Sequence, residues 1–108
     1  MANRQTLQWL EQRGLHPRVA EGLNETADWA AARGVDLVVF GSFARGENRP
    51  GSDLDLGLLW RQERDAAVAV KIEDQLDQLP TVRRIDVVDF SRVSPDFRKQ
   101  ALRSVRKL

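Results

Sequence analysis

Residues 38–60 have the sequence VVFGSFARGENRPGSDLDLGLLW. The segment begins as an apolar strand, turns at Gly41-Ser42, and ends in a second strand over residues 53–60. Side chains of a strand alternate between its two faces, which places one apolar series on a single face: Leu54, Leu56, Leu58 and Trp60. Asp53 and Asp55 must then stand together on the opposite face. The segment predicts two adjacent carboxylates beside a glycine-serine turn.

Helices are expected on both sides of this segment. Apolar residues recur at helical spacing, between capping and stop signals, in residues 4–13, 17–34 and 65–79. Ser94-Pro95 opens a last helix, whose apolar face is expected to consist of Phe97, Ala101, Leu102 and Val105. Short helical turns are also expected after Gly41, and a tight turn at Arg49-Pro50-Gly51.

Two more strands complete the expected sheet. Residues 35–40 are apolar except for Asp36, as in a central strand covered on both faces. Residues 82–90 form the other strand, with Asp86 on one face and Asp89 on the opposite one. An acid within an apolar strand is costly without a positive partner, so both acids require an explanation.

Length and composition limit the class of protein. The chain has 108 residues, which suits one domain over residues 1–108. Its net charge of +1 argues against direct binding of DNA or RNA, although residues 91–108 carry six basic residues and only Asp96 as an acid. The absence of cysteine excludes disulfides and thiolate metal sites. With no apolar run suited to a signal peptide or a membrane span, we expect a cytoplasmic protein without membrane contact.

The residues of the central segment fit metal-assisted phosphate chemistry. Two carboxylates at i and i+2 on a strand reach one hard cation, and Mg²⁺ is commonly held by one or two carboxylates and substrate phosphates. Gly41 allows close approach of the backbone to a phosphate, while Ser42 and Arg45 supply a hydroxyl and a positive charge. A third strand acid would complete a two-ion site, and Asp86 is the expected one. Each signal is weak alone, but the combination is informative.

The same residues resemble a known family. Gly41-Ser42, a gap of ten residues and Asp53-Leu54-Asp55 are similar to the signature of the DNA polymerase β-like nucleotidyltransferase superfamily. The stretch GSFARGENRPGSDLDL resembles its minimal nucleotidyltransferase branch. The resemblance implies an α/β (α+β) fold in which a mixed three- to four-stranded sheet packs with helices.

The resemblance also implies roles and partners. Asp53, Asp55 and Asp86 would be the catalytic carboxylates and would bind two Mg²⁺ ions, with Asp86 assisting deprotonation of the acceptor hydroxyl. Gly41, Ser42 and Arg45 would bind the triphosphate of ATP. Minimal members resemble the antitoxins of HEPN/MNT toxin-antitoxin pairs, which transfer AMP to a tyrosine of an RNase toxin. A HEPN-type toxin would then be the partner in a hetero-oligomer and would supply the acceptor surface.

Four alternatives stay open at this stage. The chain could be an antitoxin or binding module that neutralises its partner by contact alone, without catalysis. An Asp-x-Asp of the glycosyltransferase type is a more remote reading, because that motif needs no Gly-Ser ten residues upstream. Asp89 competes with Asp86 as third acid, although we expect it to cap the end of its strand. The basic residues of 91–108 form either a solvated face or a partner surface.

Overall fold

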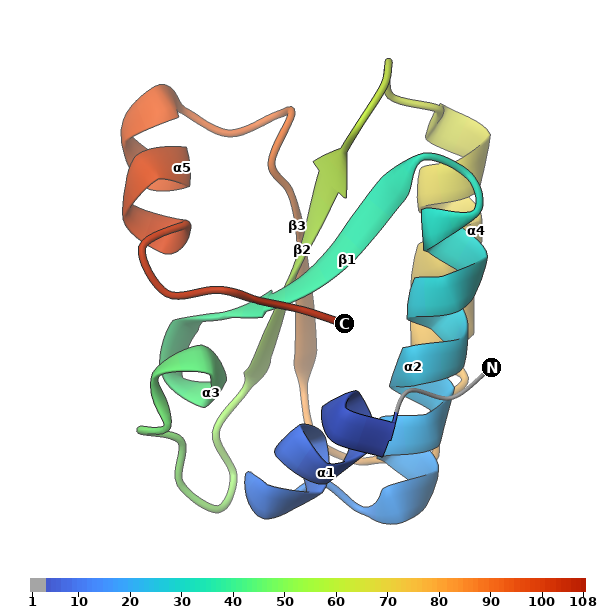
Figure 1. Ribbon diagram of the computed structural model, residues 1–108. Helices are drawn as coiled ribbons and strands as arrows, with labels where there is room; N and C mark the ends of the chain where they lie inside the picture. The colour runs from blue at the N-terminus through green and yellow to red at the C-terminus, as the bar shows by residue number, and fades with distance from the viewer. Residues whose placement is uncertain (1–3) are drawn as a thin grey trace.

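The computed structural model describes residues 4–108 as a mixed α/β fold built around one sheet (Figure 1). Its elements follow the chain in this order: α1 Arg4–Gln12, α2 Pro17–Ala31, β1 Val35–Phe40, α3 Gly41–Arg45, β2 Leu54–Trp60, α4 Ala66–Asp77, β3 Ile85–Asp89, α5 Pro95–Ala101 and β4 Arg106–Lys107. The expected fold class is confirmed. Among the described residues, no helix combines the length and apolar character that crossing a membrane requires.

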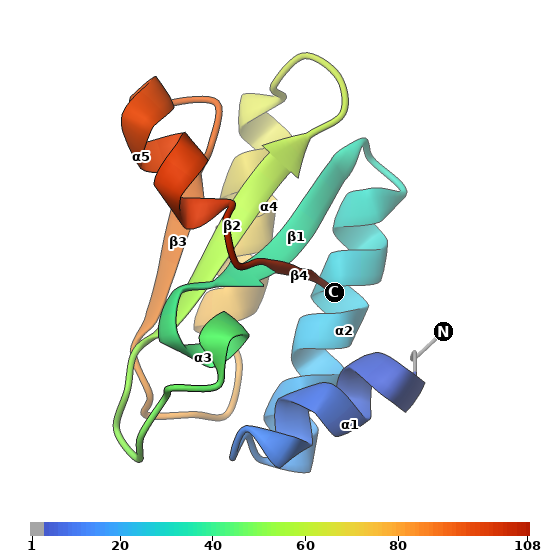
Figure 2. The same ribbon diagram turned by 60° about the vertical axis from the view of Figure 1, so that its left-hand side comes forward.

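The four strands lie in the order β3-β2-β1-β4. β1 pairs antiparallel with both β2 and β4, whereas β2 and β3 run parallel. The long connection through α4 is what a parallel pair requires, because parallel strands cannot be joined by a tight turn. As a result, the ends of β1 and the starts of β2 and β3 meet at one edge of the sheet (Figure 2).

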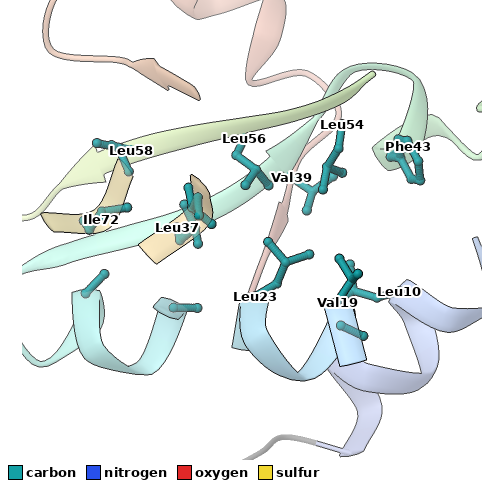
Figure 3. Close-up of a cluster of buried hydrophobic side chains, with 14 of the residues drawn as sticks. Leu10, Val19, Leu23, Leu37, Val39, Phe43, Leu54, Leu56, Leu58 and Ile72 are labelled. Atoms are coloured by element: carbon teal, nitrogen blue, oxygen red, sulfur yellow. The ribbon is translucent and has the colours of Figure 1, made fainter. Parts of the chain in front are cut away.

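Helices α1, α2 and α4 cover one face of the sheet, and α5 lies on the opposite face (Figures 1 and 2). The larger core forms under the first three helices. There Leu10, Val19 and Leu23 meet the strand residues Leu37, Val39, Leu54, Leu56 and Leu58, all at most 3% exposed (Figure 3). The alternation predicted for β2 is confirmed, since its leucines at 54, 56 and 58 all enter this core. A smaller core of Val38, Phe40 and Phe90 lies under α5.

Local sequence signals explain the element boundaries. The carboxylate of Asp65 accepts hydrogen bonds from the amides of Ala67 and Val68, which caps α4. Ser94 caps α5 in the same way by accepting from the amide of Phe97. The predicted turn at Arg49-Pro50-Gly51 is confirmed, because the Ser52 amide donates to the Arg49 carbonyl at 2.9 Å and Gly51 has a φ of +88°.

Two boundaries differ from the sequence expectation. The expected strand over 82–90 is shorter, because Val82 is fully exposed and β3 begins at Ile85. The last helix ends at Ala101, and residues 106–107 instead form β4 at the edge of β1. Val105 was therefore wrongly assigned to the helix. The reason is tertiary: Lys107 pairs with Asp36, and Leu108 packs against the main core, neither of which a continued helix would allow.

Candidate active site

The sheet register brings the predicted acids to one edge. Asp55 on β2 pairs with Phe40 at the end of β1 on one side and with Asp86 on β3 on the other. Neighbouring strands lie about 4.8 Å apart, so the backbones at Asp55 and Asp86 are adjacent. Asp53 directly precedes β2, two residues before Asp55. The neighbouring acids Asp53 and Asp55 and the distant Asp86 therefore belong to one small region.

Gly41 lies directly against the Asp55 carboxylate. A Cβ atom added to Gly41 would lie 2.3 Å from Oδ2 of Asp55, which is far inside van der Waals contact. Gly41 also has a φ of +72°, a conformation that favours glycine. Both facts explain why glycine occupies the junction between β1 and α3. The carboxylate of Asp55 occupies the space that a side chain at position 41 would need.

The surroundings of Asp55 disfavour the charged form of its carboxyl group. Burial raises its pKa above the ordinary value, and the nearby carboxylates of Asp86 and Asp53 raise it further. Arg45 opposes this shift, because its positive charge lowers the pKa of Asp55. The region thus concentrates negative charge that a cation would stabilise.

The turn after β1 is held firmly against the helical layer. Phe43 in α3 is fully buried, and its carbonyl accepts a hydrogen bond from Nε of Arg13 at 2.7 Å. The following loop is held by Arg83, whose Nη1 donates to the Ser52 carbonyl at 2.6 Å and whose guanidinium lies over the Phe43 ring. Asn48 donates to the Arg13 carbonyl at 2.8 Å. These contacts preorganise the segment between Gly41 and Asp53.

The predicted phosphate-binding residues share this turn. Ser42 is the second residue of α3 and is half-buried. Arg45 lies at the end of α3, is exposed, and forms an ion pair with Glu47 at 3.1 Å. Exposed pairs of this kind contribute little to stability, so the guanidinium is free to exchange Glu47 for an anionic ligand. The structure therefore places Gly41, Ser42 and Arg45 on one short segment beside Asp55.

Asp86, the expected third acid, lies beside Asp55 in the sheet, but its carboxylate forms an ion pair with an arginine. Oδ1 of Asp86 accepts from Nε of Arg84 at 3.0 Å. Within residues 4–108, no three or more His, Cys, Asp and Glu side chains are gathered closely enough to hold a metal ion. The acids nevertheless fit Mg²⁺ in chemistry, because they offer hard carboxylate oxygens from adjacent strands beside Gly41. Their assignment as metal ligands stays a prediction.

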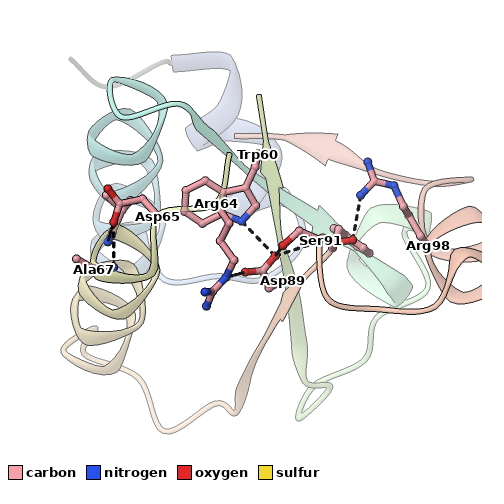
Figure 4. Close-up of polar contacts among 9 residues, drawn as sticks. Trp60, Arg64, Asp65, Ala67, Asp89, Ser91 and Arg98 are labelled. Atoms are coloured by element: carbon pink, nitrogen blue, oxygen red, sulfur yellow. Dashed lines mark hydrogen bonds and ion pairs between the residues drawn. The ribbon is translucent and has the colours of Figure 1, made fainter. Parts of the chain in front are cut away.

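Asp89, the competing third acid, has a structural role instead (Figure 4). Its carboxylate accepts from Nε1 of Trp60 at 3.1 Å, from Nε of Arg64 at 2.6 Å, and from the amide and hydroxyl of Ser91. Burial alone would raise the pKa of Asp89, but the hydrogen bonds from Ser91, Arg64 and Trp60 outweigh it and hold that pKa below its ordinary value. The interpretation of Asp89 as a cap of the strand end is confirmed.

A cleft next to the turn was not foreseen. It has a volume of about 610 Å³ and lies between the β1–α3 junction and α5. Phe40, Gly41 and Arg45 line one side, and α5 with the residues after it lines the other, including Phe97, Gln100, Ala101, Arg103 and Ser104. The sequence carried one signal, an apolar stripe on the last helix, but only the packing of α5 shows that Phe97 faces a cleft.

A family comparison and one structural comparison agree with the observed fold. The family described as "Polymerase beta, Nucleotidyltransferase" matches residues 35–108. A solved structure provisionally described as a minimal nucleotidyltransferase shares 30% sequence identity at a TM-score of 0.66, covering 99% of this chain and 100% of that chain. A chain described as "toxin-antitoxin with AMP-PNP" shares 22% identity at a TM-score of 0.49, covering 78% of this chain and 71% of that chain. The search of curated proteins gave no match.

Proposed function

The chain belongs to the polymerase β nucleotidyltransferase family, and we propose that it transfers AMP from ATP to a hydroxyl group of a partner protein in a Mg²⁺-dependent reaction. The observation that carries the proposal is the position of Asp55. Its carboxylate lies against Gly41, in register with Asp86, and two residues after Asp53. A concentration of acids next to a glycine-serine turn suits a nucleotide and its metal ions.

The turn binds the triphosphate in this proposal. The hydroxyl of Ser42 donates to a phosphate oxygen, and Arg45 leaves Glu47 to pair with the same anion. Gly41 lets the chain approach the phosphates without a side chain in the way. Buried Phe43 and the bond from Arg13 keep this turn in place, so little ordering is required when the nucleotide binds.

The acids supply the chemistry. Asp53, Asp55 and Asp86 would hold Mg²⁺, which offsets the negative charge that develops on the phosphate oxygens. Asp86 takes the proton of the acceptor hydroxyl, and the hydroxyl oxygen bonds to the α-phosphorus. The bond from that phosphorus to the bridging oxygen of the β-phosphate breaks, and pyrophosphate leaves with the electron pair. For this step Asp86 must release Arg84, which an exposed pair does at small cost.

The acceptor is proposed to be a protein. Asp53 is exposed and the side chain of Asp86 is 37% exposed, so a hydroxyl carried by a second macromolecule has access to the site. The resemblance of GSFARGENRPGSDLDL to minimal nucleotidyltransferases supports a tyrosine of a HEPN-type RNase toxin as acceptor, with this chain as the antitoxin. Residues 1–108 act in this proposal as one cytoplasmic minimal nucleotidyltransferase domain.

A transfer assay combined with a neutralisation assay tests the function. ATP labelled at the α-phosphate is incubated with the chain, Mg²⁺ and the partner toxin. The proposal expects label on the toxin, none when Asp53→Ala replaces the wild type, and loss of protection of cells by Asp55→Ala. If Asp55→Ala protected cells as well as the wild type did, neutralisation would be by contact alone, and the enzymatic proposal would be wrong.

A further inference from the structure

The cleft beside Gly41 is continuous with the proposed phosphate site. Gly41 and Arg45 line it, and Phe40 pairs directly with Asp55 in the sheet. A ligand whose phosphates contact Ser42 and Arg45 would therefore extend into this cleft with its non-phosphate part. The volume of about 610 Å³ lies within the usual range for small-molecule sites.

Two aromatic residues, Phe40 and Phe97, line the cleft, and Phe90 packs behind them. Phe40 and Phe90 are buried, with ring centroids 5.3 Å apart, and the Phe97 ring packs against both at 6.4 Å. Phe97 is nevertheless 44% exposed. The two buried rings fix its orientation from below, while its outer surface is open to the cleft. A flat apolar surface held in this way suits stacking of a planar ring.

Gly57 makes this arrangement possible. A Cβ atom on Gly57 would lie 2.0 Å from Cε2 of Phe90, so only glycine leaves room for the Phe90 ring in this position. The α5 helix is also tied to this cluster, because Nη1 of Arg98 donates to the Phe90 carbonyl at 3.0 Å. The position of Phe97 therefore follows from the sheet and is built into the fold.

From these contacts we propose that the cleft binds the nucleoside of the nucleotide substrate, with Phe97 stacking on its base. The inference rests on the proposed function and adds the residues that recognise the nucleoside. Gln100 lies one helical turn after Phe97 and also lines the cleft. Its side-chain amide both donates and accepts hydrogen bonds, which is what reading the polar edge of a base requires. Gln100 is the specificity-determining residue in this proposal.

Binding measurements without turnover test the inference. Titration calorimetry in Mg²⁺ compares ATP with inorganic tripolyphosphate, which shares the phosphates but lacks the nucleoside. Phe97→Ala is expected to lower the affinity for ATP about tenfold, which is the effect of losing one base-aromatic stack, and to leave the affinity for tripolyphosphate unchanged. Phe97→Tyr keeps the ring and should keep ATP affinity. Val70→Ala, at an exposed apolar position on α4, is the control that should change neither.

The outcomes separate this inference from the proposed function. The stacking role would be overturned if Phe97→Ala bound ATP as tightly as the wild type, or if it lost affinity for ATP and for tripolyphosphate equally. Nucleotide binding at the turn would still stand in either case. If the wild type bound neither ligand, both proposals would fail. For Gln100, the ratio of ATP to GTP affinity should move toward one in Gln100→Ala, and an unchanged ratio would contradict its role in specificity.

Discussion

Gly41 and Asp55 are in direct steric contact, although fourteen positions separate them: a Cβ atom at position 41 would lie 2.3 Å from Oδ2 of Asp55. The contact links the two halves of the sequence segment that decides the fold. It joins the turn that is proposed to bind phosphate to the acid that is proposed to bind metal. Glycine at this position is therefore a requirement of the site as well as of the backbone.

Gly41→Ala should separate these two requirements. Both Gly41 and Gly51 have positive φ, at +72° and +88°, so alanine at either is expected to cost about 1 kcal/mol of stability. Only at Gly41 does the new methyl group meet a carboxylate, whereas nothing lies within 4 Å of it at Gly51. Mg²⁺-dependent ATP binding should be lost in Gly41→Ala and kept in Gly51→Ala. Equal binding by the two variants would show that the contact with Asp55 is irrelevant to the site.

Asp55→Asn is expected to raise stability while removing transfer. The pKa of Asp55 is raised by burial and by Asp86 and Asp53, so its charge at neutral pH opposes folding when no cation is bound. Without Mg²⁺ at pH 7, Asp55→Asn should melt at a higher temperature than the wild type. Asp74→Asn, which alters an exposed acid on α4, should leave the melting temperature unchanged. A lower melting temperature for Asp55→Asn would contradict this view of the site.

Asp86 and Asp89 should give opposite results. Asp89→Asn breaks the charge-assisted bonds from Arg64, Trp60 and Ser91, and should cost about 2 kcal/mol in the free energy of unfolding while transfer is kept. Asp86→Asn should abolish transfer and change stability little, because the ion pair that Asp86 forms is with exposed Arg84. Denaturant unfolding and the labelled-ATP assay check both variants. Loss of transfer in folded Asp89→Asn would make Asp89 the third acid.

The stabilisation from Asp89 should depend on pH. Its pKa in the folded state lies below its ordinary value, so the folded protein binds fewer protons at this carboxylate than the unfolded chain does. The contribution is therefore complete above the unfolded pKa of about 4 and is lost as the pH falls through the folded pKa. The difference in unfolding free energy between wild type and Asp89→Asn should shrink between pH 5 and more acidic values, by about 2 kcal/mol in total. If this difference in unfolding free energy did not change with pH, the stabilisation would not come from the charge of Asp89.

Gly57→Ala should disturb the α5 side alone. The added methyl group would lie 2.0 Å from the Phe90 ring, and forcing that ring aside is expected to cost about 2 kcal/mol and to weaken ATP binding through Phe97. Gly22→Ala is the comparison, since its methyl group would meet only the flexible end of Leu79. Unfolding and calorimetry measure both effects. Unchanged ATP affinity in Gly57→Ala would show that the position of Phe90 on the sheet does not affect binding in the cleft.

The sequence predicted the elements that repeat a simple period, and the structure agrees with them. Alternation in residues 53–60 placed the leucines on one face and Asp55 on the other. The turn signal at Arg49-Pro50-Gly51 located the loop that precedes β2. The strand at Arg106–Lys107 was missed because the residues after Ala101 fit a helical stripe as well as a short strand. Only the ion pair of Lys107 with Asp36 and the open edge of β1 distinguish the two. Tertiary contacts of this kind leave no local pattern.

The same limit applied to the site. The spacing of Gly41, Asp53 and Asp55 pointed to phosphate chemistry, but no periodicity shows that Asp86 is in register with Asp55, because register between strands that are far apart in sequence depends on the sheet order. The cleft was missed for a related reason. Phe97 fits the apolar face of a helix whether that face is fully covered or half open, and its exposure of 44% appears only after α5 is packed.

The central claim is that this site adds AMP to a protein hydroxyl. Intact-mass and peptide mass spectrometry of the partner toxin, purified after co-expression with the chain, tests it most directly. We expect a toxin whose mass is raised by one or more AMP groups located on tyrosine, and an unmodified toxin when Asp53→Ala or Asp55→Asn replaces the wild type. An unmodified toxin with the wild-type chain, or a modification that persists in folded Asp55→Asn, would contradict it.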